Sequence, residues 1–402
     1  MTLRAITTSM AVLALVISPS VSASAATTTT LSSSAGPDYV AMGDSYSSGV
    51  GNAPYSNSKS TFVASGTASA GVQVSSFGDS LADGCDRSAL AQGSFATSVA
   101  LSLNLTGYTD VACSGATSTG MLHPDRGEPA QVQAVSASVN LVTLTAGGND
   151  APSWESVVQK CVDVVITTHL NSAMPYYQTG GFFPGAGCAT AVAAKETALT
   201  TTGTTNLVSL YRQILSRMAP TGRLIVVPYP TLAPLASGRD CLLTPTLPVT
   251  RKTWGQAIGL SSVNYGRLAG MVKAMDAAIT AAAATAGGSA PSRILVAPVT
   301  HLAGWLNCQP WTEKLHPSGL HGMTLLPAGL PPKATSGLIR PCLVLSRLSH
   351  QYAGCVAGAW IARLASSLRA GSPVIANGSL HPTLTGQSEL AGAVLTSWRS
   401  TP

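Results

Sequence analysis

The sequence predicts an α/β fold in which helices cover both faces of a mostly parallel sheet. Short apolar runs rich in β-branched residues end at Gly, Pro or Asp, and segments with the three- and four-residue spacing of helices separate several of them. Strands that alternate with helices in this way form parallel sheets. The composition agrees, because 45% hydrophobic and 9% charged residues over 402 positions are enough for a large buried core.

The expected elements follow one another along the whole chain. Helical spacing of apolar residues predicts one helix around Leu207 to Met218 and a longer, Ala-rich one from Tyr265 to Ala284. The weakest strand candidate is the second of the five apolar runs, which are Tyr39 to Met42, Tyr108 to Cys113, Leu141 to Thr145, Leu224 to Val227 and Ile294 to Val299.

The N-terminal residues predict export. Arg4 precedes a short apolar stretch from Met10 to Ile17, and Ala23-Ser24-Ala25 has the small-x-small pattern of a cleavage site. The apolar stretch is shorter than the roughly 20 residues that a membrane-spanning helix needs. We therefore expect a signal peptide at residues 1–25, a loose polar leader at 26–36, and a secreted, extracellular protein.

Eight cysteines accompany this export signal, and none of them forms a C-x-x-C pair. An even number of cysteines in an exported chain predicts disulfides, and pairing of neighbours in sequence is the hypothesis that closes the shortest loops. Eight cysteines allow 105 connectivities, so the sequence does not decide among them. The residues concerned are Cys85, Cys113, Cys161, Cys188, Cys241, Cys308, Cys342 and Cys355.

Polar residues and glycines follow three of the expected strands. Ser45 comes directly after the first strand, Gly115 after the second, and Asn149 with Asp150 after the third. Ligands of parallel sheets bind at the carboxyl ends of the strands, near a topological switch point. These residues are therefore expected to gather at one edge of the sheet.

Four blocks of sequence carry a resemblance to a known family. "GDSYSSG" at 43–49, "ACSGATS" at 112–118, "GGND" at 147–150 and "SLHPTLTGQ" at 379–387 occur in the order seen in secreted actinobacterial GDSL esterases and lipases of the SGNH hydrolase superfamily. The chain resembles these enzymes from about residue 38 to its C-terminus, except in residues 309–372. The resemblance implies a three-layer α/β/α, flavodoxin-like domain with a five-stranded parallel sheet.

The same resemblance implies a role for individual residues. Ser45 matches the nucleophile and His381 the general base, while the Ser45 N–H, the Gly115 N–H and the Asn149 side-chain amide match the oxyanion donors. The residues themselves are suited to this chemistry, because a serine hydroxyl becomes nucleophilic when an adjacent imidazole accepts its proton. Asp44 and Asp150 match positions that order the turns around the site.

One position departs from the family pattern. Many members carry an Asp three residues before the histidine, where this chain has Gly378. The resulting hypothesis is a Ser–His dyad in which a backbone carbonyl, most simply that of Gly378, holds the imidazole in the required tautomer. A competing base is His316, because Glu313 lies three residues before it.

The stretch before His381 also departs from the alternation of strands and helices. Residues 309–372 are rich in Leu, Pro, Gly and Arg and are interpreted as an insertion in a single hydrolase domain that spans 37–402. A helix is predicted within it at Gly354 to Leu368, either packed on the core or acting as a lid. The sequence after Pro382 predicts a capped C-terminal helix.

The sequence predicts a secreted carboxylic ester hydrolase that acts on lipid or other fatty-acyl esters through an acyl-enzyme on Ser45. The alternatives are a carbohydrate deacetylase of the same fold and an exported wall- or lipid-binding protein without activity. The mechanism needs no cofactor, and we expect a monomer that contacts lipid surfaces transiently.

Nucleic acid and metal ions are not expected as partners. The sequence has no dense Lys/Arg run of the kind that indicates nucleic-acid binding. No His or Cys cluster has the spacing of a metal site, and Asp79, Asp83 and Asp86 lack the EF-hand pattern.

Overall fold

The computed structural model describes fourteen segments of the chain, which are residues 38–52, 54–56, 58–64, 71–78, 83–161, 163–167, 179–183, 187–232, 241–242, 247–248, 255–300, 325–326, 374–375 and 381–400. The predicted signal peptide and leader lie outside these residues. So does nearly all of the predicted insertion, including its expected helix and His316. Among the described helices, none combines the length and the apolar character needed to cross a bilayer.

The main sheet has seven strands in the order β12-β8-β5-β1-β4-β3-β2. Six of them are parallel, and β2 pairs with β3 in the antiparallel sense at one edge. The strands are β1 Asp38–Gly43, β2 Ser60–Ala64, β3 Gly71–Ser75, β4 Gly107–Asp110, β5 Val139–Thr145, β8 Arg223–Val226 and β12 Ile294–Val296.

The α/β class and the five expected strands are confirmed, but the predicted number of strands is wrong. The expected runs form the central strands β12, β8, β5, β1 and β4, in the flavodoxin-like order. The structure adds β2 and β3 beside β4. These two strands lack a continuous apolar run because they lie at the edge, where Phe62 of β2 is 55% exposed.

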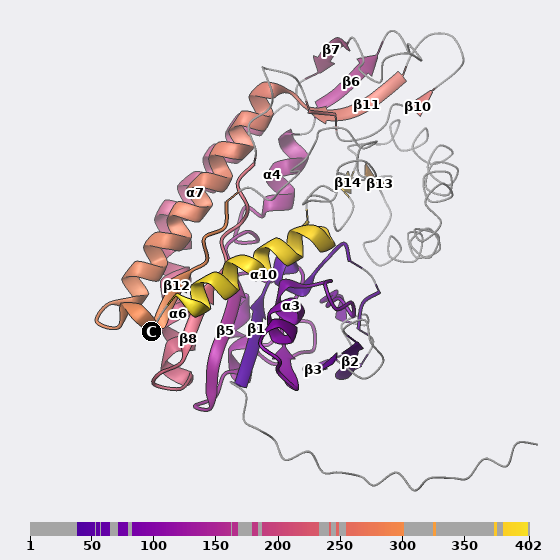
Figure 1. Ribbon diagram of the computed structural model, residues 1–402. Helices are drawn as coiled ribbons and strands as arrows, with labels where there is room; N and C mark the ends of the chain where they lie inside the picture. Colours follow the sequence, from indigo (N-terminus) through magenta and orange to yellow (C-terminus); the bar gives the residue numbers. More distant parts are fainter. Residues whose placement is uncertain are drawn as a thin grey trace, which may run out of the picture. The chain divides into compact units, whose positions relative to one another are not determined.

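Helices cover both faces of this sheet. Figure 1 shows α10 and α3 crossing one face, and these two helices pack on each other, whereas α6 and α7 pack together on the other side. This arrangement follows from right-handed crossovers that leave β1 in opposite directions along the sheet. The helices are α3 Phe95–Ser102, α4 Trp154–Cys161, α5 Cys188–Ala198, α6 Thr204–Arg217, α7 Ser262–Gly287 and α10 Leu384–Arg399.

The helix predictions are confirmed where the structure describes them. α6 and α7 contain the two predicted helical stretches, and α10 is the capped helix expected after Pro382. Short helical turns complete the domain: α1 Ser45–Ser48, η1 Gly120–Leu122, η2 Gln131–Ala134, the π-helical turn Leu199–Gly203 and η5 Pro291–Arg293.

Two smaller sheets lie outside the main one. The first is antiparallel, with the order β10-β11-β6-β7 and β9 also paired to β11, and the second joins β13 to β14. Their strands are β6 Asp163–Thr167, β7 Thr179–Phe183, β9 Cys241–Leu242, β10 Leu247–Pro248, β11 Gly255–Leu260, β13 Leu325–Leu326 and β14 Val374–Ile375.

The core is centred on β1 and β5. In β5 every residue except Asn140 is buried, which is typical of a parallel strand covered on both faces. The chain leaves β1 first toward β4 and then returns to β5 on the other side. This switch point lies at the carboxyl end of β1, where Ser45 follows.

Candidate active site

The serine turn, residues 43–49, begins where β1 ends. Asp44 caps the short helix α1 by accepting a hydrogen bond from the Tyr46 N–H at 3.0 Å. Gly43 has φ +132°, and a Cβ there would lie 2.6 Å from Ser47 Oγ and 2.7 Å from the Thr145 carbonyl oxygen. The buried Gln131 amide pairs with both the N–H and the carbonyl of Gly43, at 2.8 and 2.9 Å. The turn is therefore fixed from both sides, and only glycine fits at its start.

Ser45 and His381 meet although 336 residues separate them. His381 Nε2 lies 2.7 Å from Ser45 Oγ, and the ring of Tyr46 packs 5.1 Å from the imidazole ring. Ser45 is 8% exposed. A hydroxyl and an imidazole at this distance have the geometry in which a base activates a nucleophile.

α10 holds the His381 segment against the domain. Gln387 of α10 accepts a hydrogen bond from the Phe95 N–H at 2.8 Å and donates one to the Tyr46 carbonyl at 3.1 Å. Asn52 Nδ2 donates to the Pro382 carbonyl at 2.9 Å. Because Tyr46 follows Ser45, the same contacts that dock α10 also join it to the serine turn.

Asp44 and Tyr229 connect the serine turn to neighbouring strands. The Thr145 hydroxyl donates to Asp44 Oδ1 at 2.6 Å, and the Tyr229 hydroxyl donates to Asp44 Oδ2. The same tyrosine oxygen accepts the Gly148 N–H at 2.9 Å. Burial raises the pKa of Asp44 to about 6, against the opposing effect of these hydrogen bonds.

The Gly115 loop, residues 112–116, follows β4. Its Cys113 N–H donates to the Gly43 carbonyl at 2.9 Å, which places the loop directly beside the serine turn. Gly115 has φ +80°, and a Cβ there would lie 2.7 Å from Arg126 Nη2. Arg87 and Arg126 donate to the carbonyls of Ala112 and Ser114, at 2.8 and 2.6 Å.

The Asn149 loop, residues 147–150, follows β5 and contacts the Gly115 loop. Asn149 Nδ2 donates to the Ala116 carbonyl at 3.2 Å. The Asp150 carboxylate accepts hydrogen bonds from the N–H and the hydroxyl of Ser118, both at 2.7 Å. The structure therefore brings together the segments of Ser45, Gly115, Asn149 and His381. Gly378 lies outside the described residues.

Two disulfides join neighbouring cysteines, in agreement with the pairing hypothesis. Cys85 is bonded to Cys113, next to the Gly115 loop, and Cys161 to Cys188, which links the end of α4 to the start of α5. Cys241 lies in β9, for which the structure describes the backbone pairing. Cys308, Cys342 and Cys355 lie outside the described residues.

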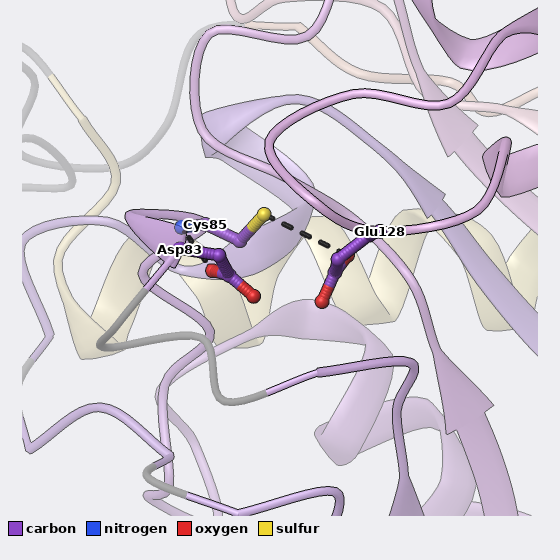
Figure 2. Close-up of side chains that lie close together, drawn as sticks. All are labelled: Asp83, Cys85 and Glu128. Atoms are coloured by element: carbon purple, nitrogen blue, oxygen red, sulfur yellow. Dashed lines mark hydrogen bonds between the residues drawn. The ribbon is translucent and has the colours of Figure 1, made fainter.

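An acidic cluster lies beside the first disulfide (Figure 2). Donor atoms of Asp83, Cys85 and Glu128 lie within 4.8 Å of one another. The Cys85 sulfur is already bonded to Cys113, and both Glu128 oxygens accept hydrogen bonds from the buried Arg87 guanidinium. These donors do not fit a metal ion, because one is a disulfide sulfur and another is neutralised by arginine. Burial, with Glu128 close by, raises the pKa of Asp83 to about 6.

Sequence reasoning missed three residues that hold the site, namely Gln387, Tyr229 and Lys195. Gln387 carried a usable signal, because it occupies the helical stripe that continues through Leu390, Ala391 and Val394 and a polar residue there must find a buried partner. Tyr229 and Lys195 gave no such signal, since their partners are backbone atoms and a carboxylate distant in sequence.

Comparison with known proteins identifies the family. The model of the GDSL-like Lipase/Acylhydrolase family matches residues 76–319, which is more than half of the chain. The chain belongs to this family. The match includes both Gly115 and Asn149 of the GDSL-like protein, whereas Ser45 and His381 lie outside the matched range and are brought to these residues by the fold. No curated protein matches the sequence.

Solved structures are similar to this GDSL-like protein at low sequence identity. An extracellular lipase from Streptomyces rimosus is 21% identical, with a TM-score of 0.50, covering 91% of this chain and 100% of that one. A phospholipase A1 from Streptomyces albidoflavus NA297 is 22% identical, with a TM-score of 0.48, covering 92% of this chain and 100% of that one. The similarity to the lipase concerns the fold, and it leaves the substrate open.

Proposed function

We propose that the protein is a secreted serine hydrolase of carboxylic esters that works through an acyl-enzyme on Ser45. The observation that carries this proposal is the 2.7 Å contact between Ser45 Oγ and His381 Nε2. Membership of the GDSL-like Lipase/Acylhydrolase family supports the same reaction class. Two independent features, the N-terminal signal pattern and the disulfides, support secretion.

The proposed reaction has two steps. Ser45 Oγ attacks the ester carbonyl carbon while His381 Nε2 accepts the hydroxyl proton, and His381 then gives this proton to the leaving alcohol. Water then attacks the acyl-enzyme while His381 accepts a proton from it, and His381 returns this proton to Ser45 Oγ as the bond to the acyl group breaks and the acid is released. The Ser45 N–H, the Gly115 N–H and the Asn149 amide are the proposed donors to the oxyanion of both tetrahedral intermediates. No cofactor takes part in the proposed steps.

The first test is labelling and loss of activity. A fluorophosphonate probe is expected to label Ser45, as read by peptide mass spectrometry, and Ser45→Ala is expected to abolish hydrolysis of p-nitrophenyl esters. His381→Ala should lose activity and His316→Ala should keep it. Full activity of His381→Ala would contradict the assignment of the base. An unlabelled Ser45 in an inactive wild type would favour the binding-protein alternative.

For the substrate, we propose a lipid or other fatty-acyl ester bound by a monomer that touches lipid surfaces transiently. Leu384, which begins α10 three residues after His381, is 40% exposed and offers an apolar contact near the site. A p-nitrophenyl series from acetate to palmitate tests this proposal, with Ser45→Ala as the control. A rate that rises with acyl length supports it, whereas activity confined to acetate would favour the carbohydrate deacetylase.

A further inference from the structure

Lys195 is a fully buried lysine beneath the Asn149 loop. It lies in α5, and its side chain is 1% exposed. Its Nζ donates hydrogen bonds to the carbonyl oxygens of Gly147, Gly148 and Asp150, at 2.9, 3.2 and 2.6 Å. Lysine is almost never fully buried without compensation, so this arrangement needs a physical reason.

The compensation comes from backbone carbonyls. An ammonium group has three N–H donors, and the three carbonyls of one loop accept them. Within the described residues, no carboxylate lies within ion-pair distance of Lys195. Burial lowers the pKa of Lys195 to about 8, while the charges of Asp150 and Asp44 oppose this change. The group therefore stays mainly protonated at neutral pH.

The three accepting carbonyls surround the residue that matters for the proposed chemistry. They belong to both residues before Asn149 and to the residue after it, so one cation fixes the backbone on either side of this residue. The Asn149 side chain itself extends to Ala116 of the Gly115 loop. The Cys161–Cys188 disulfide fixes the start of α5 about two helical turns before Lys195, so the backbone that carries the lysine is covalently restrained.

We propose that Lys195 is a positioning residue that holds the Asn149 amide where it donates to the oxyanion. The proposal rests on the proposed function, because it assigns Lys195 a part in ester hydrolysis through Asn149. The competing view is that Lys195 only stabilises the fold. The two views differ in one respect: a positioning residue loses its effect on kcat once Asn149 is removed, whereas a purely structural effect does not depend on Asn149.

A double-mutant cycle distinguishes these views. Lys195→Met, Asn149→Ala and the double variant are assayed with a p-nitrophenyl ester, and wild type with Ser45→Ala first establishes that hydrolysis depends on the nucleophile. Lys195→Met is expected to lower kcat by about tenfold or more with KM within about twofold. In the Asn149→Ala background the same change should lower kcat by less than about threefold. The matched control is Lys273→Met on the exposed face of α7, which should leave kcat unchanged.

The outcomes are separable. Equal losses in both backgrounds, or an unchanged kcat in a folded Lys195→Met variant, would overturn the positioning role. Near-UV circular dichroism checks folding, and if Lys195→Met does not fold, Lys195→Gln carries the same cycle with a neutral donor. A wild type without Ser45-dependent hydrolysis would instead refute the proposed function, and with it this role.

Discussion

The Gly115 loop and the Asn149 loop are held in different ways, although both follow central strands and supply proposed oxyanion donors. Two arginines bind carbonyls of the Gly115 loop, one of them neutralised by Glu128, and a disulfide ends within the loop at Cys113. In the Asn149 loop, Lys195 donates to three carbonyls, and the Trp154 N–H also donates to one of them, that of Gly148, at 2.8 Å. A covalent bond fastens the first loop, whereas the second is held by hydrogen bonds, which also come from Tyr229 and Ser118. Because one substitution at Lys195 removes three of these hydrogen bonds, we expect the geometry of the Asn149 loop to be the more sensitive to a single change.

The largest expected effect comes from the proposed donor of the Asn149 loop. Asn149→Ala removes one oxyanion donor, so kcat should fall by about a hundred- to a thousandfold with little change in KM. Steady-state kinetics on a p-nitrophenyl ester measures it. Asn140→Ala, at the other end of the same strand, is the control. A loss of less than about threefold for Asn149→Ala would remove Asn149 from the proposed site.

A smaller effect is expected at the corresponding residue of the other loop. Gly115→Ala strains a left-handed backbone and brings a Cβ to 2.7 Å from Arg126 Nη2, so kcat should fall by roughly tenfold. Gly127 has a similar φ of +82° with nothing within 4 Å of a Cβ. Gly127→Ala therefore shares the strain without the contact, and it should keep nearly full kcat. Equal losses in both variants would show that strain alone is responsible.

The two disulfides should contribute similarly to stability but differently to activity. They span 28 and 27 residues, so loss of either should lower the free energy of unfolding by a similar amount, roughly 3.5 kcal/mol on the chain-entropy account. Paired Cys→Ala variants measured in urea test this expectation. The Cys85/Cys113 variant should also lose several-fold in kcat, because Cys113 lies two residues from Gly115. Identical kcat values in both variants would contradict the fastening that we assign to this disulfide.

The smallest effect on kcat is expected from Asp276, which supports the Asn149 loop through Tyr229 in the segment after β8. Substitution of Asp276 should change the stability of the protein rather than kcat. Asp276 accepts the Tyr229 N–H at 3.0 Å, and burial raises its pKa to about 8. A raised folded-state pKa means that the native state holds this proton more tightly than the unfolded state. The contribution of the protonated Asp276 carboxyl to stability is therefore complete below about pH 4, and it is lost as the pH rises through about 8.

Asp276→Asn removes this loss, because the amide oxygen still accepts the Tyr229 N–H and does not ionise. The unfolding free energy of the variant minus that of wild type should therefore increase by on the order of 4 kcal/mol when the pH is raised from about 5 to about 9. Urea unfolding at both pH values measures the gain. Asp125→Asn, at an exposed position, should show none. A parallel pH dependence of wild type and Asp276→Asn would contradict the pKa assigned to Asp276.

The α/β class, the five central strands, the two long helices after β5 and the capped C-terminal helix could all be predicted from the amino-acid sequence. The sequence carries these features because apolar periodicity and capping residues are local signals. It also predicted that Ser45, Gly115, Asn149 and His381 gather at one edge of the sheet, since strand ends and the family motifs mark all four. The strand number was wrong because β2 and β3 form a half-exposed edge pair without a continuous apolar run.

The contacts that hold these residues in place could not be predicted from the sequence and are seen only in the folded protein. Gln387 joins α10 to the serine turn, Tyr229 joins Asp44 to Gly148, and Lys195 binds three carbonyls of the Asn149 loop. In each case at least one partner is a backbone atom, and backbone atoms look the same at every position of a sequence. Which of them lies within reach of a buried side chain depends on how distant segments pack, and the fold alone determines that.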